Sequence, residues 1–402
     1  MNWLRRAIST NPRKDRDAAV YWFLVVFAVL FPLFAIVISG GSPSFWLSFM
    51  ADGGVYMLLA LGLNVVVGFA GLLDLGYAAF FAIGAYTYAF LASNHLEVTP
   101  LQTSAHVPFW IVLFVALFVA AAFGVMLGAP TLRLRGDYLA IVTLGFGEIV
   151  PRVFKNAAVW TSGVNGISAL DTPQLPFWIQ GPWSGDSFAF VTNLKIFDPL
   201  GYYVIMCLLL LLAIILVRNL QHSRMGRAWA AIREDEVAAA AMGVNTVQAK
   251  LLAFAIGASV SGFAGTFYGA KLSLVSPENF TFVVSITVLV MVVLGGMGNI
   301  PGVLSGSLLL YWVTFWLLPG LPETATNIAN SFGLTSLTHT SGDFPGIGEY
   351  ISRLKFLIFG LILVVTMLVR PQGLVPSRER QQELTKGTKD DTIIEDIQAE
   401  VG

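Results

Sequence analysis

The chain has 402 residues, of which 56% are hydrophobic and only 12% are charged, and its formal net charge is −1. Soluble domains carry about 25% charged residues, so this composition excludes an ordinary cytosolic enzyme and a disordered chain. The near-neutral charge also excludes a general attraction to nucleic-acid phosphates. The single cysteine, Cys207, excludes an internal disulfide and cysteine-rich metal patterns. The sequence therefore predicts an integral membrane protein.

Ten apolar runs follow one another along the chain. They are Val20–Ile38, Val55–Gly68, Tyr77–Ala92, Phe109–Leu132, Tyr138–Val159, Gly201–Arg218, Leu251–Ala270, Phe282–Leu294, Val303–Leu318 and Leu354–Arg370. A membrane-spanning helix needs roughly 20 mostly apolar residues, and these runs lack the alternation of membrane β-strands. We predict an all-α, polytopic transmembrane helix bundle of about ten spans. The first run exceeds the roughly 7–15 apolar residues of a signal peptide, so we expect a retained helix.

The basic residues orient this bundle. With the N-terminus in the cytoplasm, 17 of the 23 Lys and Arg residues lie on the inner side. This asymmetry agrees with the positive-inside rule and predicts that both termini are cytoplasmic. We therefore expect a cytoplasmic segment 1–19, a transmembrane domain 20–376 and a charged cytoplasmic tail 377–402. Two long outer loops are predicted at about 160–199 and 319–353.

Two glycine-rich stretches, Gly68–Gly76 and Gly295–Gly302, connect neighbouring spans. Glycine lets helices break and backbones approach closely, and broken helices at membrane depth occur only where they line a cavity or are covered by protein. The first stretch is either a re-entrant element beside a substrate path or a tight inner hairpin in which Asp74 caps the third span. The candidate residues for a translocation path here are Gly68, Gly71, Asp74, Gly76, Gly295, Gly296 and Gly298.

One acidic residue, Glu148, falls inside a predicted span. It lies about ten residues into the fifth run, roughly 15 Å along a helix and near the middle of the bilayer. A carboxylate at that depth must face the bundle or water. Two interpretations stay open: Glu148 lines a pathway or binds a substrate amine, or it forms a hydrogen bond between helices.

The segment Gln221–Lys250 is the most informative inner loop. Ala228–Ala241 is rich in strong helix formers, and Gly243 follows where a C-cap glycine is expected. We predict one short helix at about 226–243 that inserts into a groove on a soluble partner. The alternative is a helix lying at the membrane interface, for which Trp229 and Ile232 would supply apolar contacts.

Several chemical signatures are missing from the sequence. There is no Walker A pattern and no HExxH motif, and the four histidines are scattered. The chain is therefore not expected to bind ATP phosphates itself, to hold a metal or to carry catalytic residues. A membrane enzyme would need a converging polar site, so a transport protein is the better prediction.

Five long blocks and a short sixth, in order, carry a family resemblance. They are Gly62–Tyr86, Leu132–Ile149, Ser223–Asn245, Phe263–Phe282, Val293–Gly306 and the RPQGL sequence at Arg370–Leu374. Over nearly all of residues 20–376, the sequence resembles the LivM-type permeases of ABC importers for branched-chain amino acids. The resemblance implies a permease subunit of an ATP-driven, binding-protein-dependent importer of Leu, Ile or Val in the bacterial cytoplasmic (inner) membrane.

The resemblance also implies partners. They are a homologous LivH-like permease, two ABC ATPase subunits that bind ATP and Mg, an extracytoplasmic amino-acid-binding protein and membrane lipid, with no cofactor in this chain and no nucleic acid. The inner helix is similar to the family's coupling helix, although a valine follows Glu236 and the downstream Ile-x-Leu-Pro of the related EAA loop is missing. The residues predicted to couple to the ATPases are Arg227, Arg233, Glu234, Asp235, Glu236, Ala238, Ala239 and Gly243.

Two alternatives remain for the function. Related permeases carry urea, amides or other amino acids, and specificity in such importers resides largely in the binding protein. An alternative of another class is a proton-coupled secondary transporter that uses Glu148 and needs no ATPase.

Overall fold

A computed structural model describes residues 12–39, 43–131, 137–173, 199–331, 346–369 and 373–375. The predicted N-terminal segment before residue 12, the tail 377–402 and most of the outer loop 160–199 lie outside these residues. The described chain is helical apart from two pairs of two-residue strands, so the all-α prediction is confirmed. The chain divides into two compact units, Met1–Val292 and Val293–Gly402.

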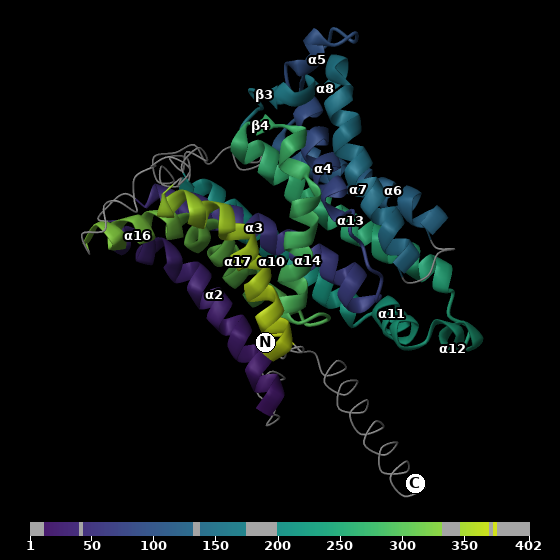
Figure 1. The fold of residues 1–402 in the computed structure, drawn as a ribbon. Coiled ribbons are helices and arrows are strands. Elements are labelled where there is room, and N and C mark those ends of the chain that lie inside the picture. Colours follow the sequence, from purple (N-terminus) through teal and green to yellow (C-terminus); the bar gives the residue numbers. More distant parts are fainter. Residues whose placement is uncertain are drawn as a thin grey trace, which may run out of the picture. The chain divides into compact units, whose positions relative to one another are not determined.

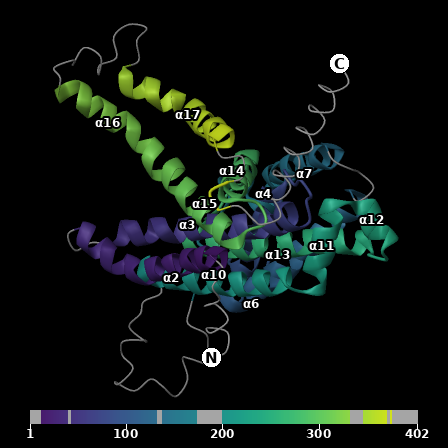
Figure 2. The ribbon, with the colours of Figure 1, turned by 90° about the horizontal axis from the view of Figure 1, so that it is seen from below.

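The first unit is built around one central helix, α13 (Thr246–Leu272), which packs against three others (Figure 1). These are α3 (Ser44–Leu63), α4 (Tyr77–Leu91) and α6 (Phe109–Thr131). Helix α10 (Pro199–Gln221) lies along α3, and the Tyr203 hydroxyl donates to the Ala28 carbonyl of α2 (Pro12–Ile38) (Figure 2). The remaining long helices are α7 (Asp137–Asn156) and α14 (Phe282–Gly295), which reaches the boundary of the unit.

Shorter elements sit at the two ends of α13. Near its N-terminus are α11 (Arg224–Glu234) and α12 (Glu236–Ala241). Strand β4 (Leu274–Val275) follows its C-terminus and pairs antiparallel with β3 (Ile167–Ser168). The same end of the unit carries β1 (Ala92–Ser93) paired with β2 (Ala105–His106), α5 (His95–Val98) and α8 (Ala158–Thr161). Figure 1 shows α5 and α8 at one end of the unit and α11 and α12 at the other.

Small residues bring the central helices into close contact. A methyl group added at Gly262 of α13 would lie 2.5 Å from the Ala120 side chain of α6. One added at Gly265 would overlap the Phe81 carbonyl of α4. Inside a membrane the hydrophobic effect does not drive helices together, and small residues instead let their backbones pack closely. The core of the unit therefore lies between α13, α4 and α6.

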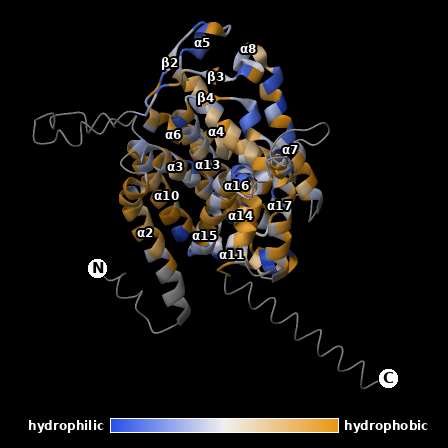
Figure 3. Ribbon diagram, turned by 60° about the vertical axis from the view of Figure 1, so that its left-hand side comes forward, coloured by the Kyte–Doolittle hydropathy of each residue, from blue (hydrophilic) through white to orange (hydrophobic). Residues whose placement is uncertain are grey.

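Each of the ten predicted runs coincides with a helix. Among the described residues, seven helical segments are long and apolar enough to cross a membrane: Val20–Ile38, Ser44–Phe69, Phe109–Pro130, Pro199–Gln221, Thr246–Leu272, Pro277–Gly295 and Ile300–Ser331. The apolar helix Tyr77–Leu91 is shorter. Figure 3 shows hydrophobic residues over α2 and α10, whose outward side chains are suited to lipid.

In the second unit, much of the predicted outer loop 319–353 is helical. Its helix α15 (Ile300–Trp312) continues through a π-helical turn, η5 (Val313–Leu317), into α16 (Leu318–Ser331), and α17 (Ile347–Val369) begins before residue 353. The predicted loop began at Pro319, a residue that has no amide hydrogen to donate to the helix. The helix nevertheless continues, with the π-helical turn η5 ending two residues before Pro319 and α16 running on to Ser331. The loop prediction was wrong at both ends, and 332–345 lies outside the described residues.

Candidate functional site

The predicted inner helix at 226–243 is two helices, so the single-helix prediction was wrong. Asp235 has an extended backbone (φ −154°, ψ 112°) between α11 and α12. Its carboxylate accepts hydrogen bonds from the Val237 and Ala238 amides at 2.8 and 3.0 Å. An aspartate in this position satisfies the free amides of a new helix start. Asp235 therefore ends one helix and caps the next.

The predicted C-cap glycine is confirmed. Gly243 has a φ of +86°, the left-handed conformation that glycine adopts without strain. The Val244 amide donates to the Ala239 carbonyl and the Gly243 amide to the Ala240 carbonyl, each at 3.0 Å. These two bonds form a Schellman motif. The motif gives α12 a sharp end, where Met242 is exposed.

The apolar face of α11 packs on the protein. Trp229 is fully buried, and its indole N–H donates to the Ala249 carbonyl in the first turn of α13 at 2.7 Å. Ile232 is buried as well. The two residues that would have anchored a helix at the membrane interface are thus already used inside the chain. This arrangement fixes α11 to the start of α13.

Several residues predicted to contact the ATPases instead make contacts with other residues of this chain. The Glu236 carboxylate lies 2.6 Å from the Lys250 ammonium, whose side chain is only 7% exposed. The Arg233 guanidinium donates to the Gly68 carbonyl at 2.7 Å, and Ala239 is buried. Glu236 therefore ties α12 to α13. The predicted coupling residues that remain exposed are Arg227, Glu234, Asp235, Ala238 and Gly243.

The Gly68–Gly76 stretch begins beside α11, at the Gly68 carbonyl, and its last two residues pack against α7 between Thr143 and Gly147, beyond the first turn of that helix. Helix α3 ends in a π-helical turn, η1 (Asn64–Phe69), and the chain then runs beside α7. The Leu75 amide donates to the Thr143 hydroxyl at 3.0 Å, and a methyl group at Gly76 would overlap the Thr143 carbonyl. Thr143 is about 9 Å along α7 from its first residue, at ~1.5 Å per residue. This depth favours the re-entrant interpretation.

Asp74 does not cap helix α4. The N-cap residue is Gly76, and the Ala78 amide in the first turn of α4 donates to the Ser285 hydroxyl at 2.9 Å rather than to Asp74. Asp74 is buried, with one carboxylate oxygen accepting the Gly76 amide at 2.9 Å. Its other oxygen has no hydrogen-bond partner among the described residues. A buried carboxyl group with one unused oxygen is costly, and Asp74 stays a candidate for the path.

Glu148 lies on the outward face of α7 and pairs with a residue on its own helix. The Arg152 guanidinium is 3.2 Å from its carboxylate, and the two side chains are 73% and 42% exposed, respectively. Ile149 and Val153 are exposed beside them. Charges in a membrane helix face water or other protein rather than lipid. This face of α7 is therefore suited to a pathway or to a protein partner.

The second glycine stretch forms the hairpin between α14 and α15. Gly296 and Gly298 have positive φ angles of 112° and 82°, and a methyl group at Gly295 would lie 2.5 Å from the Gly302 carbonyl oxygen. Residues 373–375 pair with this hairpin through the Leu374 amide, which donates to the Leu294 carbonyl at 2.8 Å. The two predicted path stretches thus belong to different units of the chain.

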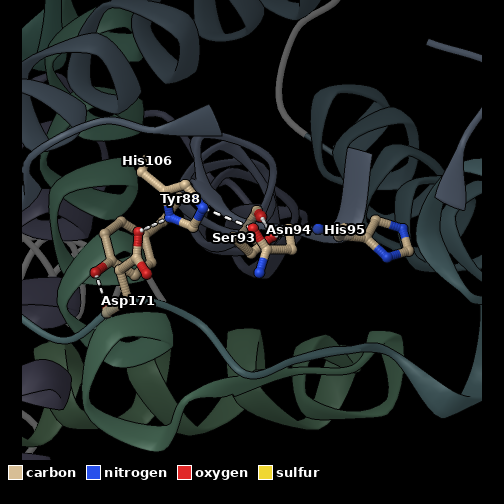
Figure 4. Close-up of polar contacts among 7 residues, drawn as sticks. Tyr88, Ser93, Asn94, His95, His106 and Asp171 are labelled. Atoms are coloured by element: carbon tan, nitrogen blue, oxygen red, sulfur yellow. Dashed lines mark hydrogen bonds and ion pairs between the residues drawn. The ribbon is translucent and has the colours of Figure 1, made fainter. Parts of the chain in front are cut away.

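Sequence reasoning missed a polar network at the end of the first unit that carries α5 and α8. Figure 4 shows His106 between Asp171 and Asn94. Its two ring nitrogens lie 2.7 Å from an Asp171 carboxylate oxygen and 2.6 Å from the Asn94 side-chain oxygen. The Tyr88 hydroxyl donates to the Asp171 carbonyl. No spacing in the sequence joins these residues, because His106 and Asp171 are 65 positions apart.

An ion pair at the same end of α13 was also missed. The Lys271 ammonium lies 2.5 Å from the Asp52 carboxylate and donates to the Ser48 carbonyl at 2.7 Å. The pair joins α13 to α3. Within the described ranges, no group of three or more metal-ligating side chains converges, and neither network resembles a metal site.

Comparison with known proteins places these features in a family. Residues 45–368 match the family model described as "Branched-chain amino acid transport system / permease component". The chain is 39% identical over 91% of its length to the high-affinity branched-chain amino acid transport system permease protein LivM of Escherichia coli K12, and covers 77% of that protein. No solved structure matches.

More distant relatives include a second kind of permease. The chain is 25% identical to the probable branched-chain amino acid transport permease protein LivM of Methanocaldococcus jannaschii, over 81% of this chain and 91% of that protein. It is 27% identical to the high-affinity branched-chain amino acid transport system permease protein LivH of Salmonella typhimurium, over 64% of this chain and 80% of that protein.

Proposed function

Since this chain belongs to the LivM-type permease components of branched-chain amino acid ABC transport systems, we propose that it carries Leu, Ile and Val across the bacterial cytoplasmic membrane. As a permease component it is a multi-pass membrane protein and not an enzyme. The substrate assignment is supported by the named transport systems of its relatives.

The importer contains further chains. A LivH-like permease pairs with this one, which its similarity to LivH supports. Two ATPase subunits bind ATP and Mg on the cytoplasmic side, and an extracytoplasmic binding protein delivers the amino acid. The exposed apolar side chains of α2 face lipid. Ten spans with both termini in the cytoplasm place α11 and α12 inside, and α5 and α8 outside.

The single observation that carries the coupling role is the attachment of α11 and α12 to α13. Trp229 is buried against α13, and Glu236 is paired with the buried Lys250. A displacement of the two short helices is therefore passed to the central helix of the bundle. Helix α12 exposes Val237, three alanines and, directly after its last residue, Met242, so its free surface is mostly apolar. These side chains fit a hydrophobic groove on an ATPase subunit.

The substrate passes along the outward face of α7. Its Glu148–Arg152 pair lies among exposed aliphatic side chains. The pair needs water or protein around it, which a pathway shared with the second permease supplies. The Gly68–Gly76 stretch, with the buried Asp74, packs on the inward face of the same helix.

The test uses the complete importer in lipid vesicles, with leucine uptake and ATP hydrolysis measured together. Glu236→Gln removes the charge that pairs with Lys250, and Gly243→Ala strains the left-handed cap by about 1–2 kcal/mol. Both variants are expected to hydrolyse ATP while leucine uptake falls. Glu97→Gln is a matched control, since Glu97 is exposed on α5 at the other end of the unit. Normal uptake by both coupling variants would refute the assignment.

A further inference from the structure

Arg233 faces the membrane domain, although its position on the inner surface suggested an ATPase contact. Its guanidinium donates to the Gly68 carbonyl at 2.7 Å across 165 residues of sequence. Its side chain also lies against Gly71, where an added methyl group would come within 3.0 Å of the Arg233 Cγ. Arg233 thus connects the end of α11 to the end of α3 and the beginning of the Gly68–Gly76 stretch.

The element that Arg233 holds is a π-helical turn. Residues Asn64–Phe69 form η1, and the Ala70 amide donates to the Val65 carbonyl, five residues back, at 3.2 Å. The Leu72 amide reaches the Val66 carbonyl at 3.0 Å. π-helical turns are rare, carry one residue more per turn than an α-helix and are frequent at functional sites. A π-helical turn and an α-helical turn are two discrete arrangements of the same residues.

The turn leads directly into the segment that packs on α7. Gly71 has a φ of +69°, which lets the chain reverse its course after η1. Beyond it, the Leu75 amide is bonded to Thr143, and a methyl group added at Gly147 of α7 would lie 2.8 Å from the Gly76 Cα. The neighbouring residue of α7 is Glu148. Contacts therefore run without a gap from α11 through η1 and the Gly71–Gly76 segment to α7.

We propose that Arg233 is a positioning residue for transport: it fixes the π-helical turn η1 and moves the Gly71–Gly76 segment along α7 when the ATPases displace α11. The proposal rests on the coupling role given above to α11 and α12. It differs from an ATPase contact, because the guanidinium acts on the Gly68 carbonyl inside this chain. Coupling between distant sites requires an element with two arrangements that both sites bias, and η1 is that element here.

The experiment follows the Gly71–Gly76 segment directly. Cys207 is the only cysteine of the chain, so Cys207→Ala gives a background for one introduced thiol. Leu73 is 37% exposed and carries the probe as Leu73→Cys. The rate at which a small maleimide labels this thiol is measured in the complete importer, without nucleotide and with ATP and vanadate. With Arg233 present, the two rates are expected to differ.

Arg233→Gln should bring the ratio of the two labelling rates to one and reduce leucine uptake, while ATP hydrolysis and assembly of the complex persist. Arg224→Gln is the matched control, because Arg224 is exposed on the same helix and is not among the predicted ATPase-coupling residues, and it should keep the ratio. Arg233→Lys keeps a donor for the Gly68 carbonyl and should restore part of the difference. Gly71→Ala should act like Arg233→Gln, since it strains the turn and crowds Arg233.

The outcomes separate this proposal from the proposed function. Equal labelling rates with Arg233 intact would overturn it, and so would a ratio that survives both Arg233→Gln and Gly71→Ala. In either case the Glu236 and Gly243 variants would still report on coupling. If Arg233→Gln fails to assemble, the same measurement on Arg233→Lys and Gly71→Ala decides, because a purely structural role would lower yield without removing the nucleotide dependence.

Discussion

The attachment of α11 to α13 by Trp229 has a measurable strength. Truncating a fully buried tryptophan to alanine costs about 3–5 kcal/mol, and Trp229 is completely buried with its indole bonded to the Ala249 carbonyl at 2.7 Å. Trp229→Phe keeps most of the ring but loses that hydrogen bond, at a cost of about 1 kcal/mol plus a smaller packing loss. Because ~1.4 kcal/mol is a factor of ten in an equilibrium constant, Trp229→Ala should raise the open population of α11 by roughly two to three and a half orders of magnitude.

Limited proteolysis of the purified complex in detergent, where both faces are accessible, measures this opening. Trypsin cleaves after Arg224, Arg227 and Arg233 of α11 once the helix leaves α13, and cleavage through fast local opening follows the open population. Trp229→Ala should be cleaved far faster than the unmodified chain, and Trp229→Phe moderately faster. Trp22→Ala is the control, since Trp22 is exposed on α2. Cleavage of Trp229→Ala at the unmodified rate, together with normal leucine uptake, would refute the attachment.

Two further predictions concern the Gly68–Gly76 stretch. Gly76→Ala should prevent assembly or shift α7, because the added methyl group overlaps the Thr143 carbonyl. The control Gly145→Ala should leave the melting temperature unchanged or slightly higher, because its added methyl group meets nothing within 4 Å. Equal melting temperatures for the two variants would contradict the close approach at Gly76. Asp74→Asn should be at least as stable as the unmodified chain, because the asparagine side-chain oxygen still accepts the Gly76 backbone N–H and no charge is buried. Asp74→Ala should be less stable, because it leaves that N–H without its acceptor. The order of the two melting temperatures checks this prediction.

Hydrophobicity predicted where the helices lie but not how far they extend. Each apolar run marked a helix because continuous apolar segments signal lipid or a buried core. The boundaries failed where the sequence turns polar without ending the helix. Helix α3 begins at Ser44, ahead of the predicted Val55, and α16 continues beyond Pro319 to Ser331. Helix ends depend on local hydrogen bonds that hydropathy does not report.

The break in the coupling segment was hidden for a similar reason. Arg233, Glu234, Asp235 and Glu236 read as one charged surface of a single helix, and a helix-capping aspartate looks the same in sequence as an exposed one. Whether such an aspartate caps a helix depends on whether its carboxylate accepts hydrogen bonds from the backbone amides that follow it. The role of Gly243 could be predicted because a glycine directly after a helix-forming run commonly ends the helix in a left-handed conformation.

Contacts between distant residues were beyond the reach of the sequence. Nothing near Lys250 marks it as the partner of Glu236, and nothing near Asp52 points to Lys271. Buried lysines are rare unless they are paired, yet burial itself follows from packing of helices far apart in the chain. The hydrogen bond from Arg233 to Gly68 is hidden in the same way, because its acceptor is a backbone carbonyl.

The central claim is that this chain imports branched-chain amino acids only as part of an ATP-driven complex. The most direct test is leucine accumulation in lipid vesicles containing the purified complex, with binding protein outside and ATP inside. We predict that uptake stops when ATP or the ATPase subunits are omitted and that a pH gradient does not replace them. Accumulation of leucine by this chain alone under a pH gradient, abolished by Glu148→Gln, would contradict the account.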